Sequence, residues 1–168
     1  MNLAESEPEH TTGPQLDATL DTISPAQLYD VLALSERSRF IRLLDLDAPS
    51  GSNVASNNSE PLTGHLRVAC LENSPSFAAL SYVWGEKSTL SHGILCRPHG
   101  CRIEITANCH AALCQIRKRF GAVTIWLDSV CINQADEGEK ARQIPLMREI
   151  YTWAEETYVW LGPGNDEA

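Results

Sequence analysis

One stretch, residues 123–162, limits the folds open to this chain more than any other. It opens with a short apolar run at 123–127, typical of a strand buried on both faces. Polar residues at 128–139 then predict a loop. Apolar residues recur next at helical spacing: Ile144, Met147, Ile150, Tyr151 and Ala154. A second apolar run at 157–161 ends the stretch, so the order predicts a βαβ unit with two parallel strands.

Pro145 indicates where the helix of this unit begins. Proline has no amide proton, so it is tolerated in the first turn of a helix and disrupts the interior. The helix is therefore expected to start near Ala141 or Arg142.

A second run of apolar residues, 77–83, leads into Trp84 and Gly85 and then into Glu86. It predicts another central strand that delivers polar residues at its end. Ligands of open parallel sheets bind beyond the carboxyl ends of the strands. We expect the ends of this strand and of the strand before Asp128 to be neighbours, which brings Glu86 and Asp128 to one crevice.

The remaining pattern predicts further strands at 40–46 and 62–71, a hairpin from 93–96 and 101–105, and a helix at 107–120. Thr106 is a good N-cap for that helix, and Gly121 ends it. The fold class expected is α/β: a mostly parallel sheet with flanking helices, with an antiparallel hairpin at one edge.

Length and charge predict one folded domain behind an acidic segment. The 168 residues, 43% of them apolar, are enough for one core of ordinary size. Residues 1–36 carry seven carboxylates and no Lys or Arg, and are expected to be largely disordered apart from a short helix at 25–34 that begins at Pro25. The domain is expected at 37–168. Because it is nearly neutral, without a basic stripe, a nucleic-acid partner is not expected.

Six cysteines raise the question of disulfides or metal. The acidic N-terminus has no signal-peptide pattern, so free thiols in a cytoplasmic protein are expected. No apolar run is long enough to span a membrane. The residues rich in Cys and His, at 92–114, lack the Cys-x-x-Cys spacing of zinc sites, so no metal is expected.

Glu86 and Asp128 are the candidate catalytic residues. Asp128 either binds a ribose or transfers a proton, or it caps its loop by accepting backbone hydrogen bonds. If Glu86 lies beside it, crowding of two carboxylates would raise one pKa. The other interpretation of Glu86 is a solvated loop carboxylate.

The candidate ligand-binding residues lie on the same two segments. Tyr82, Trp84 and Gly85 end one strand, where the aromatic rings either stack on a ligand or belong to the core. After the other strand, Cys131 is either a nucleophile or a buried thiol. Further along that segment, Asn133 and Gln134 either contact a nucleotide or brace the loop. Glu139 suits a helix N-terminus, where negative charge is favoured, as well as a ligand site.

Residues 77–162 contain four segments in a fixed order: FAALSYVWGE, ITANCHAALCQIR, TIWLDSVCINQADEGEKARQIPLMREIY and YVWLG. Together these segments resemble the heterokaryon-incompatibility (HET) domain of filamentous fungi. The resemblance implies a role in non-self recognition that ends in programmed cell death, with protein partners or self-association.

HET domains are in turn thought to be distant relatives of Toll/interleukin-receptor (TIR) domains, some of which hydrolyse NAD. The resemblance therefore implies a TIR- or flavodoxin-like sheet, and NAD as a substrate whose nicotinamide–ribose bond is cleaved. The essential glutamate of TIR hydrolases follows the third strand, and no motif here assigns it. Two explanations for the unassigned glutamate remain open. The chain is a family member truncated at its C-terminal end, or its domain uses other carboxylates.

Overall fold

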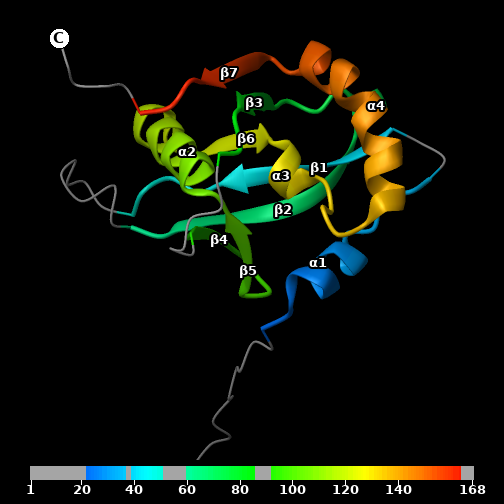
Figure 1. Cartoon of the computed structure of the whole chain (residues 1–168), viewed down its shortest axis with the longest axis horizontal. Coiled ribbons are helices and arrows are strands. Elements are labelled where there is room, and N and C mark those ends of the chain that lie inside the picture. Colours follow the sequence, from blue (N-terminus) through cyan, green and yellow to red (C-terminus); the bar gives the residue numbers. More distant parts are fainter. Residues whose placement is uncertain (1–21, 37–38, 51–59, 86–91, 164–168) are drawn as a thin grey trace, which may run out of the picture.

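The computed structural model describes residues 22–36, 39–50, 60–85 and 92–163. They form one seven-stranded sheet in the order β5-β4-β2-β1-β6-β3-β7, flanked by helices (Figure 1). The strands are β1 (Phe40–Leu46), β2 (Leu62–Cys70), β3 (Ala78–Tyr82), β4 (His92–Cys96), β5 (Cys101–Ile105), β6 (Val123–Trp126) and β7 (Glu156–Trp160). The helices are α1 (Pro25–Val31), α2 (Ala107–Phe120), α3 (Asp128–Cys131) and α4 (Glu137–Trp153), with a 3-10 turn at Leu71–Asn73.

The predicted α/β class and the edge hairpin of β4 and β5 are confirmed. The expectation of a mostly parallel sheet is not exact, because the sheet is mixed. β2 pairs parallel with β4, and β3 pairs parallel with β6 and β7. β1 pairs antiparallel with both β2 and β6. The sequence between β1 and β2 has no helical pattern, and antiparallel neighbours need no crossover helix.

The βαβ unit exists, but its two strands are not neighbours. β6 and β7 both run parallel to β3, which lies between them in the sheet. The crossover through α4 therefore passes over one intervening strand. Phe77 helps to seat β7 there, because its carbonyl accepts a hydrogen bond from the backbone N–H of Glu155 at 2.9 Å.

The predicted start of α4 is also wrong. Asp136 caps the helix, with its side chain accepting the backbone N–H of Glu139 at 3.0 Å, and the first helical residue is Glu137. Pro145 consequently lies in the interior of α4. A strong N-cap followed by acidic residues in the first turn prevails over the interior proline. The predicted loop at 128–139 likewise contains the short helix α3.

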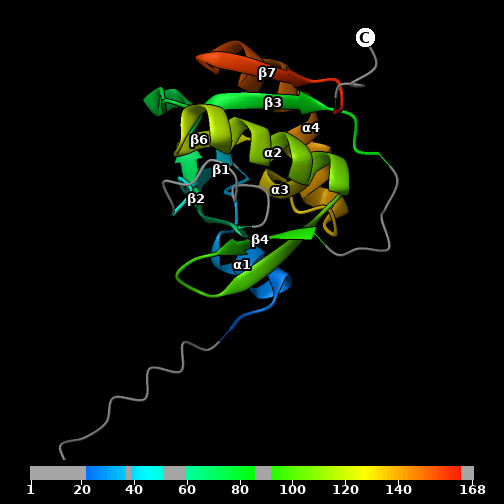
Figure 2. The same ribbon diagram turned by 90° about the vertical axis from the view of Figure 1, so that its left-hand side faces the viewer.

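The two long helices cover opposite faces of the sheet (Figures 1 and 2). α2 begins at the predicted cap Thr106 and ends at Gly121, whose φ of 76° favours glycine. α4 packs on the other face, where the ring of Tyr151 meets that of Trp126 edge-on at 5.6 Å. Ile144, predicted to face the core, is 56% exposed, because the register of α4 turns it to solvent.

The predicted short helix before the domain forms and packs on it. Ser24 and Gln27 make a capping box, with Pro25 in the first turn of α1. The helix ends at Val31, short of the predicted residue 34. Leu28 and Tyr29 are buried, whereas Val31 is exposed. α1 thus adds to the same core as the sheet.

All six cysteines are free thiols, as predicted. Among the described residues, no helix combines the length and apolar character needed to cross a membrane.

Candidate functional site

The ends of β3 and β6 lie side by side, as the sequence predicts. The two strands pair in parallel, so the residues after each of them meet at one rim of the sheet. The indole Nε1 of Trp84 donates to Oδ2 of Asp128 at 3.0 Å, and the hydroxyl of Tyr82 donates to that of Ser129 at 2.6 Å. Glu86, the other candidate catalytic residue, lies outside the described residues.

Asp128 is half-buried, and both of its carboxylate oxygens accept hydrogen bonds. Oδ2 accepts from Trp84, and Oδ1 accepts the backbone N–H of Ser129 at 2.8 Å. Burial raises the pKa of Asp128, because removing water disfavours the charged form, while the bonds from Trp84 and Ser129 lower it. Asp128 is also the first residue of α3, where negative charge is favoured. The carboxylate thus combines the capping role with a place at the rim.

Asn108, which sequence reasoning missed, ties this rim together. Its Nδ2 donates to the carbonyl of Val83 at 2.5 Å, and its Oδ1 accepts from Nε1 of Trp160 at 2.8 Å. One side chain in the first turn of α2 therefore links the ends of β3 and β7. Gly85, with φ of 73°, passes close by, since a Cβ there would lie 3.6 Å from the Cβ of Asn108. The position of Asn108 just after a predicted N-cap was the available signal.

Trp84 is 41% exposed, whereas Cys131 is fully buried. Burial raises the pKa of the Cys131 thiol to about 12. At neutral pH this thiol is protonated and shielded from solvent, which suits a packing role better than a nucleophile.

The two amide side chains both bind backbone. Nε2 of Gln134 donates to the carbonyl of Asp128 at 2.8 Å, and Oδ1 of Asn133 accepts the N–H of Ala135 at 3.1 Å. Such contacts hold the turn that connects α3 to α4. The bracing interpretation of both residues accounts for these contacts.

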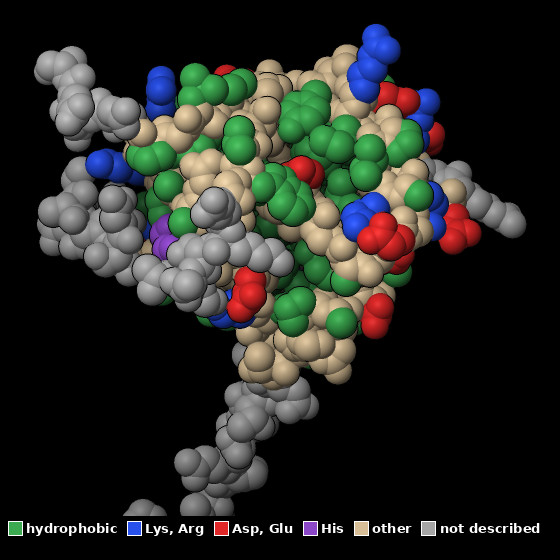
Figure 3. All heavy atoms as spheres, viewed as in Figure 1, with side chains coloured by type: hydrophobic (Ala, Val, Ile, Leu, Met, Phe, Trp, Pro, Cys, Tyr) green, Lys and Arg blue, Asp and Glu red, His purple; other side chains and the backbone are tan. Residues whose placement is uncertain are grey.

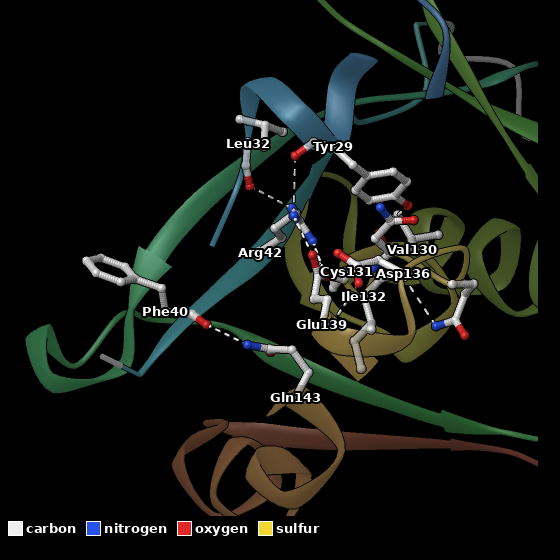
Figure 4. Close-up of polar contacts among 12 residues, drawn as sticks. Tyr29, Leu32, Phe40, Arg42, Val130, Cys131, Ile132, Asp136, Glu139 and Gln143 are labelled. Atoms are coloured by element: carbon white, nitrogen blue, oxygen red, sulfur yellow. Dashed lines mark hydrogen bonds and ion pairs between the residues drawn. The ribbon is translucent and has the colours of Figure 1, made fainter. Parts of the chain in front are cut away.

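Glu139 points into the protein and binds Arg42 (Figure 4). Nη2 of Arg42 lies 3.0 Å from Oε2 of Glu139, and Nη1 bonds Oε1 at 2.5 Å. Oε1 also accepts the backbone N–H of Asn133 at 2.8 Å. Both charged side chains are buried, so each neutralises the other.

Arg42 also reaches the N-terminal helix. Its Nε donates to the carbonyl of Leu32 at 2.9 Å, and its guanidinium lies 4.8 Å from the ring centroid of Tyr29. The hydroxyl of Tyr29 in turn donates to the carbonyl of Val130 at 2.8 Å. The pair of Arg42 and Glu139 therefore connects α1, β1, α3 and α4. The signal in the sequence was an arginine inside the apolar run at 40–46.

The described residues contain no group of three or more Cys, His, Asp or Glu side chains arranged to hold a metal ion. In the region rich in Cys and His, the imidazole rings of His92 and His110 lie with their centroids 4.6 Å apart. Burial lowers the pKa of His110, and the nearby His92 lowers it further. The sulfur of Cys114 lies 3.7 Å from Nε2 of His110.

An open cavity of about 370 Å³ lies away from this rim. Its lining residues lie just before or within β3, β6 and β7: Ser76, Phe77, Ala78, Ala122, Val123, Thr124, Glu155, Glu156 and Tyr158. Because the strands are parallel, the cavity and the rim of Trp84 and Asp128 are at opposite ends of the same strands.

The face seen in Figure 3 is rich in apolar side chains. Hydrophobic atoms gather across its upper and central part, around a small acidic patch. Three of the exposed large hydrophobic residues come from the ends of β3 and β7: Val83, Trp84 and Leu161. Such an uncovered apolar surface is typical of a protein contact site.

Comparisons with known proteins agree with the motifs at this rim. The family model described as Heterokaryon incompatibility protein (HET) matches residues 77–168. Heterokaryon incompatibility protein 6, OR allele, of Neurospora crassa is 36% identical over 164 residues. That alignment covers 90% of this chain and 23% of the relative, so the chain spans less than a quarter of the relative's length. No solved structure matches the chain. Together, the family match and the relative place this chain in the heterokaryon-incompatibility (HET) family.

Proposed function

We propose that this chain acts in heterokaryon incompatibility, as a cytoplasmic module of non-self recognition that signals programmed cell death. The observation that carries the proposal is the 36% identity to a relative named for heterokaryon incompatibility, across 90% of this chain. Since the chain spans 23% of that relative, the module corresponds to one part of the longer protein.

The contacts of the carboxylates near the rim support a binding role more than a catalytic role. Both oxygens of Asp128 are engaged by Trp84 and Ser129, and the carboxylate of Glu139 is engaged by Arg42. Val83 and Trp84 instead present apolar and aromatic surface, next to Asp128, to which the indole of Trp84 donates. Aromatic side chains with one polar atom are enriched at the centres of protein interfaces. The proposed partners are therefore proteins, including further copies of this chain.

Inducible expression of the chain in Neurospora crassa tests the proposal. Growth arrest and uptake of a vital dye are expected after induction. Leu44→Asp is the matched control, because it places a carboxylate at a fully buried position of β1 and should remove the folded protein. Normal growth of cells in which immunoblotting detects the wild-type chain would overturn the proposal.

A further inference from the structure

β7 forms one end of the sheet, and within the described residues it pairs with β3 alone. The outer side of such a strand presents backbone N–H and C=O groups that can pair with another strand. The sequence of β7, ETYVW, is rich in the aromatic and β-branched residues that favour strands. β7 is therefore suited to accept a further strand.

The other end of the sheet is protected differently. β5 alternates buried residues with the charged and exposed Arg102 and Glu104. α1 packs against β5, and the N–H of Ile23 donates to the carbonyl of His99 beside it at 3.3 Å. Charged side chains and a covering helix are common means of preventing edge pairing. In the part of the chain that the structure describes, neither feature protects the outer edge of β7 along its central residues.

The side chains around β7 are also incompletely covered. Tyr158 faces α2, where its ring stacks on that of Phe120 at 5.0 Å. Val159 points to the opposite face, the one that α4 covers over Trp126, yet Val159 is 65% exposed. Leu161, immediately after the strand, is 93% exposed. An open strand edge and uncovered apolar side chains thus occur at the same place.

We propose that β7 pairs antiparallel with β7 of a second copy, joining two sheets into one across a two-fold axis. Full overlap of this five-residue strand with itself is centred on Tyr158, its middle residue. Thr157 then lies opposite Val159 of the second copy, and the two Tyr158 rings extend the stack that begins at Phe120. The same surface contacts both copies, as two-fold symmetry requires.

The charges on β7 suit this register. Glu156 lies opposite Trp160 of the second copy, so no carboxylate faces another carboxylate directly. The two Glu156 side chains are separated by four residue steps, about 14 Å at the rise of a strand. That distance exceeds the Debye length of about 8 Å at physiological salt, so their repulsion is largely screened. A shift that centred the pairing on Glu156 would place the two carboxylates opposite each other.

This inference rests on the proposed function and deepens it, because it names one partner and the surface that binds it. Its experiment does not depend on cell death. A chain that dimerises without arresting growth would contradict the proposed function alone, and a monomeric chain that arrests growth would contradict this inference alone.

Sedimentation of the full chain at concentrations from about 5 to about 500 µM tests the dimer, since single-strand interfaces are small and weak. We expect a concentration-dependent dimer. Val159→Lys should weaken it by about tenfold or more, because it places two like charges near the axis. Val31→Lys is the matched control, since Val31 is equally exposed but lies on α1, and it should leave association unchanged.

Cross-linking tests the register. After mild oxidation with copper phenanthroline, Tyr158→Cys should form a covalent dimer through the new thiol, because that residue faces itself across the axis. Glu156→Cys should not, because its two copies lie about 14 Å apart. A wild-type chain that stays monomeric throughout, a Val159→Lys variant that associates as tightly as wild type, or equal cross-linking of the two cysteine variants would overturn the proposal.

Discussion

The guanidinium of Arg42 and the carboxylate of Glu139 form a two-point ion pair inside the protein, although 97 positions separate them in the chain. Arg42 lies on β1, in the middle of the sheet, and Glu139 lies in the first turn of α4. The pair fixes the start of α4 against the centre of the sheet.

Arg42→Met should lower the free energy of unfolding by about 3–5 kcal/mol, because it leaves the Glu139 carboxylate buried without its partner. The double variant Arg42→Met/Glu139→Leu should cost less than the sum of the single changes, since no charge remains unpaired. Urea unfolding followed by circular dichroism measures both.

The control for this prediction is the exposed pair of Arg39 and Glu149, whose charged atoms lie 3.1 Å apart. Arg39→Met should cost under about 1 kcal/mol, as solvent screens the pair. Equal losses from Arg39→Met and Arg42→Met would contradict the importance assigned to burial.

Pro145→Ala should stabilise the protein by about 1–3 kcal/mol. Pro145 is exposed and lies in the interior of α4, so alanine removes a ring that disturbs the preceding turn and restores an N–H for the carbonyl of Ala141. Thermal unfolding gives the change. Ile144→Ala, at the exposed neighbouring position, is the control and should change stability by under about 0.5 kcal/mol. A Pro145→Ala variant no more stable than wild type would show that the local backbone already accommodates proline.

The free energy of unfolding of Asp128→Asn, relative to that of wild type, should increase as pH rises from below 3.8, the ordinary pKa of the aspartate side chain. The pKa of Asp128 is raised in the folded protein, so the native state holds this proton more strongly than the unfolded chain does. Its contribution to stability is complete below the unfolded pKa and is lost as pH rises through the folded value. Urea unfolding of both proteins at about pH 3.5 and about pH 7 provides the comparison. A difference in stability that does not change with pH, or that changes in the reverse direction, would contradict the raised pKa.

The NAD cleavage implied by the resemblance to TIR domains has a direct test. Because Trp84 and Ser129 already engage the Asp128 carboxylate, we expect wild-type protein to release no more nicotinamide from NAD than Asp128→Ala does. Chromatographic assay of concentrated protein measures the product. Release by wild type that exceeds the variant would make Asp128 a candidate catalytic residue again.

The contact between Trp84 and Asp128 was predictable, because parallel strands end at the same rim of a sheet. Both strands were recognisable in the sequence as apolar runs. The helix α2 was predictable for a similar reason, since Thr106 and Gly121 mark its ends by local chemistry alone. These features depend on residues close together in the sequence.

Features that depend on distant residues were not predictable in this way. The apolar pattern of β1 gives no sign that it pairs with β6 at the centre of the sheet. The partner of Glu139 lies in that strand, so the sequence indicated a role for this carboxylate at a helix N-terminus or in a ligand site, and not the buried ion pair. Pro145 predicted the wrong start of α4 for the opposite reason. Its local preference for the first turn of a helix was overcome by the cap at Asp136 and by tertiary packing.

The place of β1 in the sheet matters to anyone who produces this domain in pieces. The family match begins at Phe77, but β6 pairs with β1, which ends more than thirty residues before that point. A recombinant fragment limited to the matched residues would lack β1. It would expose the edge of β6 that pairs with β1, and Glu139 would lose its ion-pair partner Arg42. Expression boundaries for this domain should therefore be set ahead of Ser24, the residue that caps α1.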